Sequence, residues 1–182
     1  MKSRFFPARM KSAAALASLA LFAGMQAAYC QPASPQSLTQ GASMMTVDQS
    51  RQLVAPFYDM LNQPATKNVQ ALAESVISPE WRSYSGEGVS KDRDEFIRQV
   101  AGFGKLLPDL AWNIKEVLVD GNHIVVRSEA SGTPSGDFMG IAHGGRSFRI
   151  MTIDIHTVRD GKLVTAHHVE DWAGALRQLS GK

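Results

Sequence analysis

The spacing of apolar residues divides the chain into a helical first part and a sheet-forming second part. Thr46 and Gln49 form a capping box that opens an apolar run, and this pattern marks the start of a helix. The run places residues at i, i+4 and i+8: Leu53, Phe57 and Leu61. It predicts an amphipathic helix of about four turns, which Pro56 kinks or breaks and Pro64 ends.

Two further helices follow at the same period. The second is predicted to be capped by Thr66 and stopped by Pro79, and its apolar face holds Val69, Leu72, Ala73 and Val76. The third begins near residues 90–92 with three acids in its first turn, where the helix dipole favours negative charge. Its apolar face holds Phe96, Val100, Phe103 and Leu107, and Pro108 ends it.

After Pro108 the period changes to two, which is typical of strands. Strands are predicted at 110–119, 123–131, 138–143, 146–158 and 163–169, with glycine-containing turns between them and a short helix at 172–179. Residues 81–88 are predicted to be an extended segment or a loop. Three helices followed by an antiparallel meander indicate an α+β fold with a concave sheet face.

The N-terminus has the pattern of a secretory signal peptide. Four basic residues precede an Ala- and Leu-rich stretch at 12–28 that is short for a membrane span. A permanent N-terminal anchor is the alternative interpretation. We predict a signal peptide at 1–30, a Pro- and Ser-rich tether at 31–43 and one domain at 44–182, in a periplasmic or secreted protein without membrane attachment after cleavage.

Removal of the leader changes the charge of the protein. The full chain carries a formal +2, and loss of the four basic residues leaves about −2, so the basic charge of the full chain does not indicate a nucleic-acid partner. Cys30, at the predicted cleavage site, is the only cysteine. The domain therefore has neither a disulfide nor a thiolate nucleophile.

The second half of the chain resembles the SnoaL-like polyketide cyclases, also called ester cyclases, of the NTF2-like superfamily. The matching segments, in order, are Leu107–Leu110, Asp120–Arg127, Gly132–Ile141, Asp154–Ile155, Arg159–Leu163, Glu170–Trp172 and Leu176–Leu179. The resemblance implies a cone-shaped barrel, in which three N-terminal helices pack on a curved antiparallel sheet and a cavity opens at the wide end. Two segments depart from the family pattern and concern the expected cavity: Thr133–Gly136 lacks a histidine, and Thr165–His167 replaces a Glu-x-Trp pattern.

Asp171 matches the aspartate that this family uses as an acid/base. The resemblance implies that its carboxylate faces an apolar cavity, where burial raises the pKa and allows proton transfer beside a carbonyl without a cofactor. The alternative is a helix N-cap, because Asp171 immediately precedes the predicted helix at 172–179. Both roles can hold together.

The histidines are the next candidates. His167 and His168 are adjacent on one strand, so at most one of them faces the cavity. His156 shares its strand face with Asp154 and is a second candidate for a polar group in the cavity. We predict catalytic roles for Asp171, His156 and His168, with His167 in substrate binding. No spacing supports a metal site, and none is predicted.

Several other residues are candidates for substrate binding. Arg127 lies in an apolar strand and would need an anion or an internal acid, for which Glu129 on the same face is the candidate. Apolar contacts to a flat ring are expected from Trp81, Trp112, Phe103 and Met151, although residues of these types at such spacings more often form plain core.

These observations leave two functional hypotheses open. The first is a cofactor-free cyclase, isomerase or lyase acting on a carbonyl-containing molecule. The second is an exported binding module for a small apolar ligand. A homodimer is expected by analogy with the family.

Overall fold

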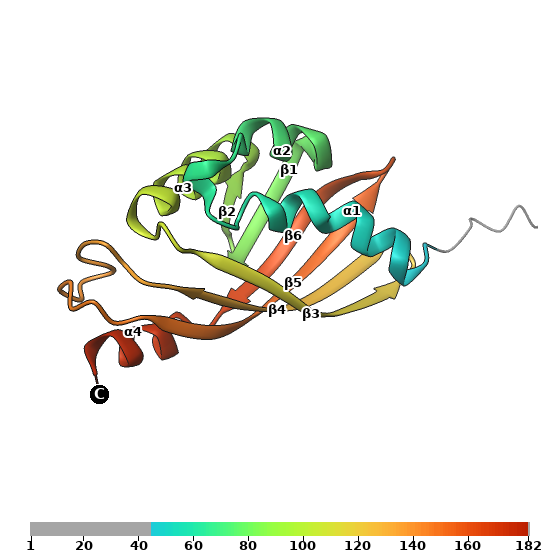
Figure 1. The fold of residues 1–182 in the computed structure, drawn as a ribbon. Helices are drawn as coiled ribbons and strands as arrows, with labels where there is room; N and C mark the ends of the chain where they lie inside the picture. Colours follow the sequence, from blue (N-terminus) through green and yellow to red (C-terminus); the bar gives the residue numbers. More distant parts are fainter. Residues whose placement is uncertain (1–44, 182) are drawn as a thin grey trace, which may run out of the picture. The chain divides into compact units, whose positions relative to one another are not determined.

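The computed structural model describes residues 45–181, which form a curved sheet with the helices that precede residue 107 over one face (Figure 1). The helices are α1 (Val47–Asp59), α2 (Val69–Val76), α3 (Arg93–Leu106) and α4 (Trp172–Ser180), with a 3₁₀ turn η1 at Pro64–Thr66. The strands are β1 (Ile77–Gly86), β2 (Val89–Asp92), β3 (Ala111–Asp120), β4 (His123–Gly132), β5 (Phe148–Arg159) and β6 (Lys162–Glu170). The predicted signal peptide, the tether and Cys30 lie outside the described residues.

The helix ends follow local capping chemistry. Thr46 and Gln49 form the predicted reciprocal capping box of α1. Pro56 does not end α1, which continues to Asp59, since a proline removes a single N–H donor from the helix. Asn68, and not Thr66, caps α2, because its side chain accepts a hydrogen bond from the Ala71 amide. In residues 45–181 no helix is long and apolar enough to cross a membrane.

The strands form one sheet in the order β2-β1-β6-β5-β4-β3. Hairpins join β3, β4, β5 and β6 as an antiparallel meander, while β1 adds to β6 in parallel. The prediction missed the extent of β1 and the short β2. The predicted strand at 138–143 was wrong: it is a loop with one isolated bridge between Phe138 and Ile141.

The two faces of the sheet differ in character. Even-numbered side chains of β4, β5 and β6 point toward the helices, and α1, α2 and α3 lie over this inner face (Figure 1). The outer face carries alternating charged and apolar side chains, many of them exposed. The structure therefore confirms the α+β fold and the period-two assignment of the inner face.

Candidate functional site

Five polar residues lie between α1 and the inner face of the sheet, and we call them the interior cluster. They are Tyr58 of α1, Asp154 and His156 of β5, and His168 and Glu170 of β6. Asp154 is 6% exposed and His156 is 0% exposed. Burying several ionisable side chains costs free energy unless they are paired. A cluster of buried ionisable groups is therefore typical of a functional site.

Tyr58 joins the two buried residues of β5. Its hydroxyl donates a 2.8 Å hydrogen bond to Oδ2 of Asp154 and lies 3.2 Å from Nε2 of His156. A tyrosine hydroxyl has one proton, so when it donates to Asp154, Nε2 of His156 must be the donor to Tyr58. The arrangement is a buried hydrogen-bonded chain from a carboxyl through a phenol to an imidazole.

Burial shifts the pKa values of Asp154 and His156 in opposite directions. Desolvation raises the pKa of Asp154 to about 7, with the hydrogen bond from Tyr58 acting against the rise. Desolvation lowers the pKa of His156 to about 3, with a smaller contribution from the charge of His168. Asp154 is therefore able to gain or lose a proton near neutral pH, while His156 stays neutral.

His168 and Glu170 form a second polar unit beside the first. Asp154 and His168 are directly opposite each other on neighbouring strands, so their side chains project side by side on the inner face. Nδ1 of His168 lies 2.8 Å from Oε1 of Glu170, and a carboxylate can only accept, so Nδ1 carries the proton. Nε2 of His168 is buried and has no hydrogen-bond partner in the described part of the chain.

A narrow pocket runs from this cluster toward α3. Its open volume is about 40 Å³, little more than the space of one water molecule. Asp154, His168 and Glu170 line it together with aromatic residues, namely Phe57, Phe96, Phe103 and Trp112. A ring-sized ligand therefore requires side chains such as Phe96 and Phe103, which are only partly buried, to move.

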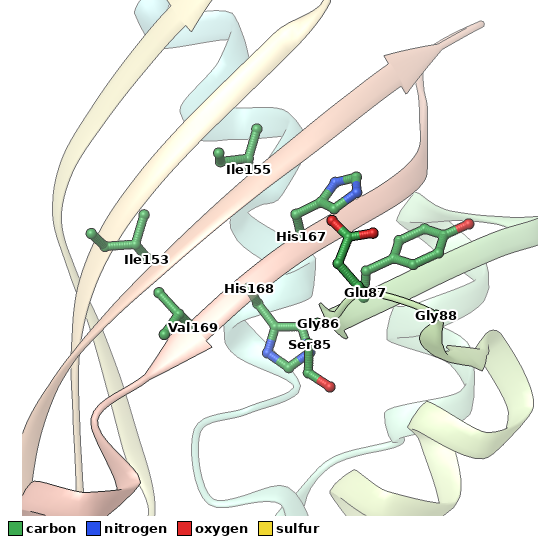
Figure 2. A pocket seen from close by; sticks show the side chains of 10 residues that line it. Ser85, Gly86, Glu87, Gly88, Ile153, Ile155, His167, His168 and Val169 are labelled. Atoms are coloured by element: carbon green, nitrogen blue, oxygen red, sulfur yellow. The ribbon is translucent and has the colours of Figure 1, made fainter.

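The larger concavity lies on the opposite face of the sheet. This outer groove has a volume of about 570 Å³. Ile153, Ile155 and Val169 provide an apolar floor, and the tip of the β1–β2 hairpin, including Glu87, provides a wall (Figure 2). The groove has the volume of a ligand site. Tyr84, Glu87 and His167 also line this groove. The buried carboxyl of Asp154, whose pKa burial raises to about 7, lines the interior pocket instead, so the interior pocket is the better catalytic candidate.

The two adjacent histidines face different environments, as predicted. His167 lies in the outer groove and stacks on Tyr84, with ring centroids 4.8 Å apart. His168 borders both the groove and the interior pocket. The last paired residues of β1 and β6 are Tyr84 and His167, so the hairpin tip diverges from β6 beside His168 (Figure 2).

Asp171 is placed at the start of α4 as its N-cap. Its carboxylate accepts a 2.8 Å hydrogen bond from the Gly174 amide, and its side chain is exposed. It does not line the interior pocket. The cap role is thus present in the structure, whereas the acid/base role of Asp171 stays a prediction without support from its position.

The other predicted binding residues separate into three groups. Trp112 and Phe103 line the interior pocket, whereas Trp81 is fully buried core. Met151 is 55% exposed on the outer face. Arg127 also lies on the outer face, where its guanidinium is 3.0 Å from Glu116. The internal pair of Arg127 with Glu129 was wrong, because the bulge in β3 brings Glu116 opposite Arg127.

Sequence reasoning missed three members of the interior cluster: Tyr58, Asp154 and Glu170. Tyr58 occupies a position that suits any core residue of an amphipathic helix, so nothing in its spacing distinguishes it. Asp154 gave one usable signal, a carboxylate on the buried parity of a strand beside His156. In residues 45–181 no group of three or more His, Cys, Asp or Glu is arranged to hold a metal ion.

Comparison with known proteins places this architecture in a family. Residues 52–179 match the model of the SnoaL-like polyketide cyclases, so the chain belongs to that family. No curated protein sequence matches the chain.

Solved structures agree on the fold. TsrD from Streptomyces laurentii is 24% identical with a TM-score of 0.64, covering 73% of this chain and 96% of its own. IdmH from Streptomyces antibioticus is 24% identical with a TM-score of 0.63, covering 72% and 98%. A SnoaL-like protein from Jannaschia sp. CCS1 is 19% identical with a TM-score of 0.64, covering 74% and 94%. At these identities the likeness establishes the NTF2-like fold alone.

Proposed function

We propose that this protein is a cofactor-free acid/base catalyst that acts on a carbonyl compound in the interior pocket. The observation that carries the proposal is the pairing of Asp154 with His168 on neighbouring strands. Nε2 of His168 is buried without a partner, and Glu170 holds Nδ1 of the same ring. A buried base beside a carboxyl whose pKa is near 7 is the combination that proton transfer at carbon requires.

The reaction begins with a carbonyl compound whose α-carbon lies at Nε2 of His168. His168 takes a proton from that carbon, and the electron pair moves onto the carbonyl oxygen. Protonated Asp154 donates its proton to this oxygen, so that no uncompensated charge develops in the apolar interior. In an isomerisation, Asp154 takes the enol proton back while protonated His168 returns its proton to a different carbon. In a cyclisation, the enol carbon attacks a second carbonyl of the same molecule, Asp154 takes the enol proton back and protonated His168 donates to the new alkoxide. Both residues then regain their starting protonation states.

Tyr58 and Glu170 are positioning residues in this scheme. Tyr58 donates to Oδ2 of Asp154, which leaves the other carboxyl oxygen to carry the proton. Glu170 fixes the ring of His168 with Nε2 available to the substrate, as a carboxylate does for a catalytic histidine. The roles expected for the family aspartate are thereby assigned to Asp154 in preference to Asp171.

The test is proton exchange into D₂O with a panel of aryl ketones and β-ketoesters. The purified protein is expected to exchange the α-protons of at least one compound, and Asp154→Asn and His168→Gln are each expected to lower the rate by about 10²-fold or more. Asp171→Asn, which is exposed and outside the pocket, serves as the matched carboxylate control. Exchange lost in Asp171→Asn and kept in Asp154→Asn would return the acid/base role to Asp171.

A non-catalytic binding module is the second candidate, and the outer groove favours it. Its volume of about 570 Å³ and its apolar floor suit a small apolar ligand, whereas the interior pocket is nearly closed. In this case no ketone in the panel exchanges, and a ligand that co-purifies with the protein is displaced by Val169→Lys at the groove floor.

We infer an exported homodimer as the setting of the acid/base activity. The basic and apolar N-terminal segment supports export, and fractionation of cells into periplasm and cytoplasm tests it. Leu118, Met151, Ile155 and Val169 are large exposed hydrophobic residues on the outer face of a single sheet. Such a patch favours association. A second copy on this face would cover the outer groove, so a dimer formed through it would prevent ligand binding in the groove.

A further inference from the structure

Lys91 of β2 projects its charge into the entrance of the interior pocket. It is the cross-strand partner of Ser83, a buried residue of the inner face, and opposite residues on paired strands point to the same face. Lys91, Ser83 and Gln99 of α3 all line the pocket. Lys91 is also the one lysine or arginine among the described residues of that lining.

The charge of Lys91 is not matched by an acid in the described part of the chain. Its Nζ donates a 2.7 Å hydrogen bond to Oε1 of Gln99, a neutral amide. No carboxylate of residues 45–181 lies within 4.0 Å of that nitrogen. Glu170, the acid of the same pocket nearest to solvent, is held by His168. An anionic ligand is the partner that this ammonium group and the Gln99 amide are able to bind.

Burial orders the polar groups of the pocket from entrance to floor. The Lys91–Gln99 hydrogen bond is exposed, the His168–Glu170 bond is half-buried and the Tyr58–Asp154 bond is buried. We propose that the substrate is a keto acid, with its carboxylate at Lys91 and Gln99 and its ketone at Asp154 and His168. This inference rests on the proposed function for the ketone end, whereas the carboxylate end depends only on Lys91 and its neighbour Gln99.

The experiment compares one ligand with its neutral analogue. 4-Oxo-4-phenylbutanoate and its methyl ester share the aryl ketone and differ in charge, and calorimetry measures the Kd of each for the purified protein. The acid is expected to bind about tenfold more tightly than the ester. Lys91→Gln is expected to abolish that preference, and Lys91→Arg, which keeps the charge, is expected to retain it. Lys105→Gln, an exposed charge change on α3 outside the pocket, is the control.

Three results would overturn the inference. The first is equal binding of acid and ester, and the second is a preference for the acid that survives in Lys91→Gln. The third is an absence of binding by the acid up to millimolar concentration.

The same pair of compounds keeps this inference separate from the proposed function, because both have exchangeable protons beside the ketone. Charge-dependent binding without exchange would retain the role of Lys91 and reject acid/base catalysis. Exchange with equal binding of acid and ester would retain acid/base catalysis and reject the role of Lys91.

Discussion

The hydroxyl of Tyr58 on α1 donates a 2.8 Å hydrogen bond to Asp154 on β5, joining residues 96 positions apart in the chain. The bond connects α1 to a central strand of the sheet. α1 lies over the inner face of that sheet (Figure 1). The hydrogen bond also acts on the chemistry of the site, because it stabilises the charged form of the buried carboxyl against desolvation.

Replacement of Tyr58 by phenylalanine is therefore expected to raise the pKa of Asp154 further above its value of about 7. The phenol that lowers this pKa is lost, and the burial that raises it remains. Carboxyl ¹³C titration of the labelled protein measures the shift. Tyr84→Phe, on the outer face, is the matched control and is expected to leave the titration unchanged. A pKa that falls in Tyr58→Phe would contradict the role of the hydrogen bond.

Asp154 is expected to make folding less favourable as the pH rises. Its pKa is about 7 in the folded protein, against 3.8 for an unperturbed aspartate, so the folded state binds more protons between these pH values. Its contribution is fully present below pH 3.8 and is lost as the pH rises through 7, with a total on the order of 4 kcal/mol for the full shift. Urea denaturation across pH 3.5–8 measures it. Asp154→Asn is expected to gain stability relative to the wild type with rising pH. If the free energy of unfolding of the two proteins changed with pH in parallel, the prediction would be refuted.

His156 is expected to make folding more favourable as the pH rises, which is opposite to the effect of Asp154. Its pKa is lowered to about 3 from 6.5, so the unfolded state binds more protons in that interval. The contribution is fully present above pH 6.5 and is lost as the pH falls toward 3. His156→Gln is therefore expected to lose less stability than the wild type on acidification. Because Asp154 and His156 oppose each other between pH 3.8 and 6.5, only the single variants reveal either contribution.

Asp171→Ala is expected to destabilise the protein by about 1 kcal/mol, within the usual range of about 0.5–2 for loss of an N-cap. The carboxylate accepts from the Gly174 amide, and alanine leaves that donor without its partner. Chemical denaturation measures the change, and Asp171→Ser, which also caps helices well, is expected to recover most of it. A loss in Asp171→Ser equal to that in Asp171→Ala would show that capping does not account for the effect.

The outer face is expected to determine the oligomeric state. Ile155→Lys places a charge in the centre of the exposed apolar patch and is expected to convert a dimer into a monomer, as measured by light scattering on a sizing column. Met139→Lys changes another exposed apolar residue, which lies in a loop outside the sheet, and it should leave the mass unchanged. A monomer mass for the wild-type protein would contradict the proposed dimer.

The parts of the structure that the sequence predicted are those in which local pattern decides the outcome. Alternation in 146–158 placed His156 on the same strand face as Asp154, and adjacency on one strand separated His167 from His168 without showing which of them points inward. The capping box at Thr46 marked the start of α1. β1 was not predicted in full because α2 passes into it without a turn, from Val76 to Ile77.

The site itself depends on pairings between distant segments. Nothing local in the sequence places Asp154 opposite His168, because that relation is set by the register of β5 on β6. Tyr58 reaches Asp154 only when α1 packs on the sheet. Asp171 shows the converse, since a backbone amide three residues away determines where its carboxylate points.

The position of β6 has a consequence for the order in which the molecule assembles. β6 is the last of the described strands to be synthesised, yet it lies between β1 and β5 in the sheet. The β1–β2 hairpin therefore has no strand to join until the C-terminal segment is available, and parallel pairing over so long a separation is slow. His168 and Glu170 both lie on this final strand. A chain that stops before β6 leaves β1 with an unpaired edge, and such an intermediate is prone to aggregate.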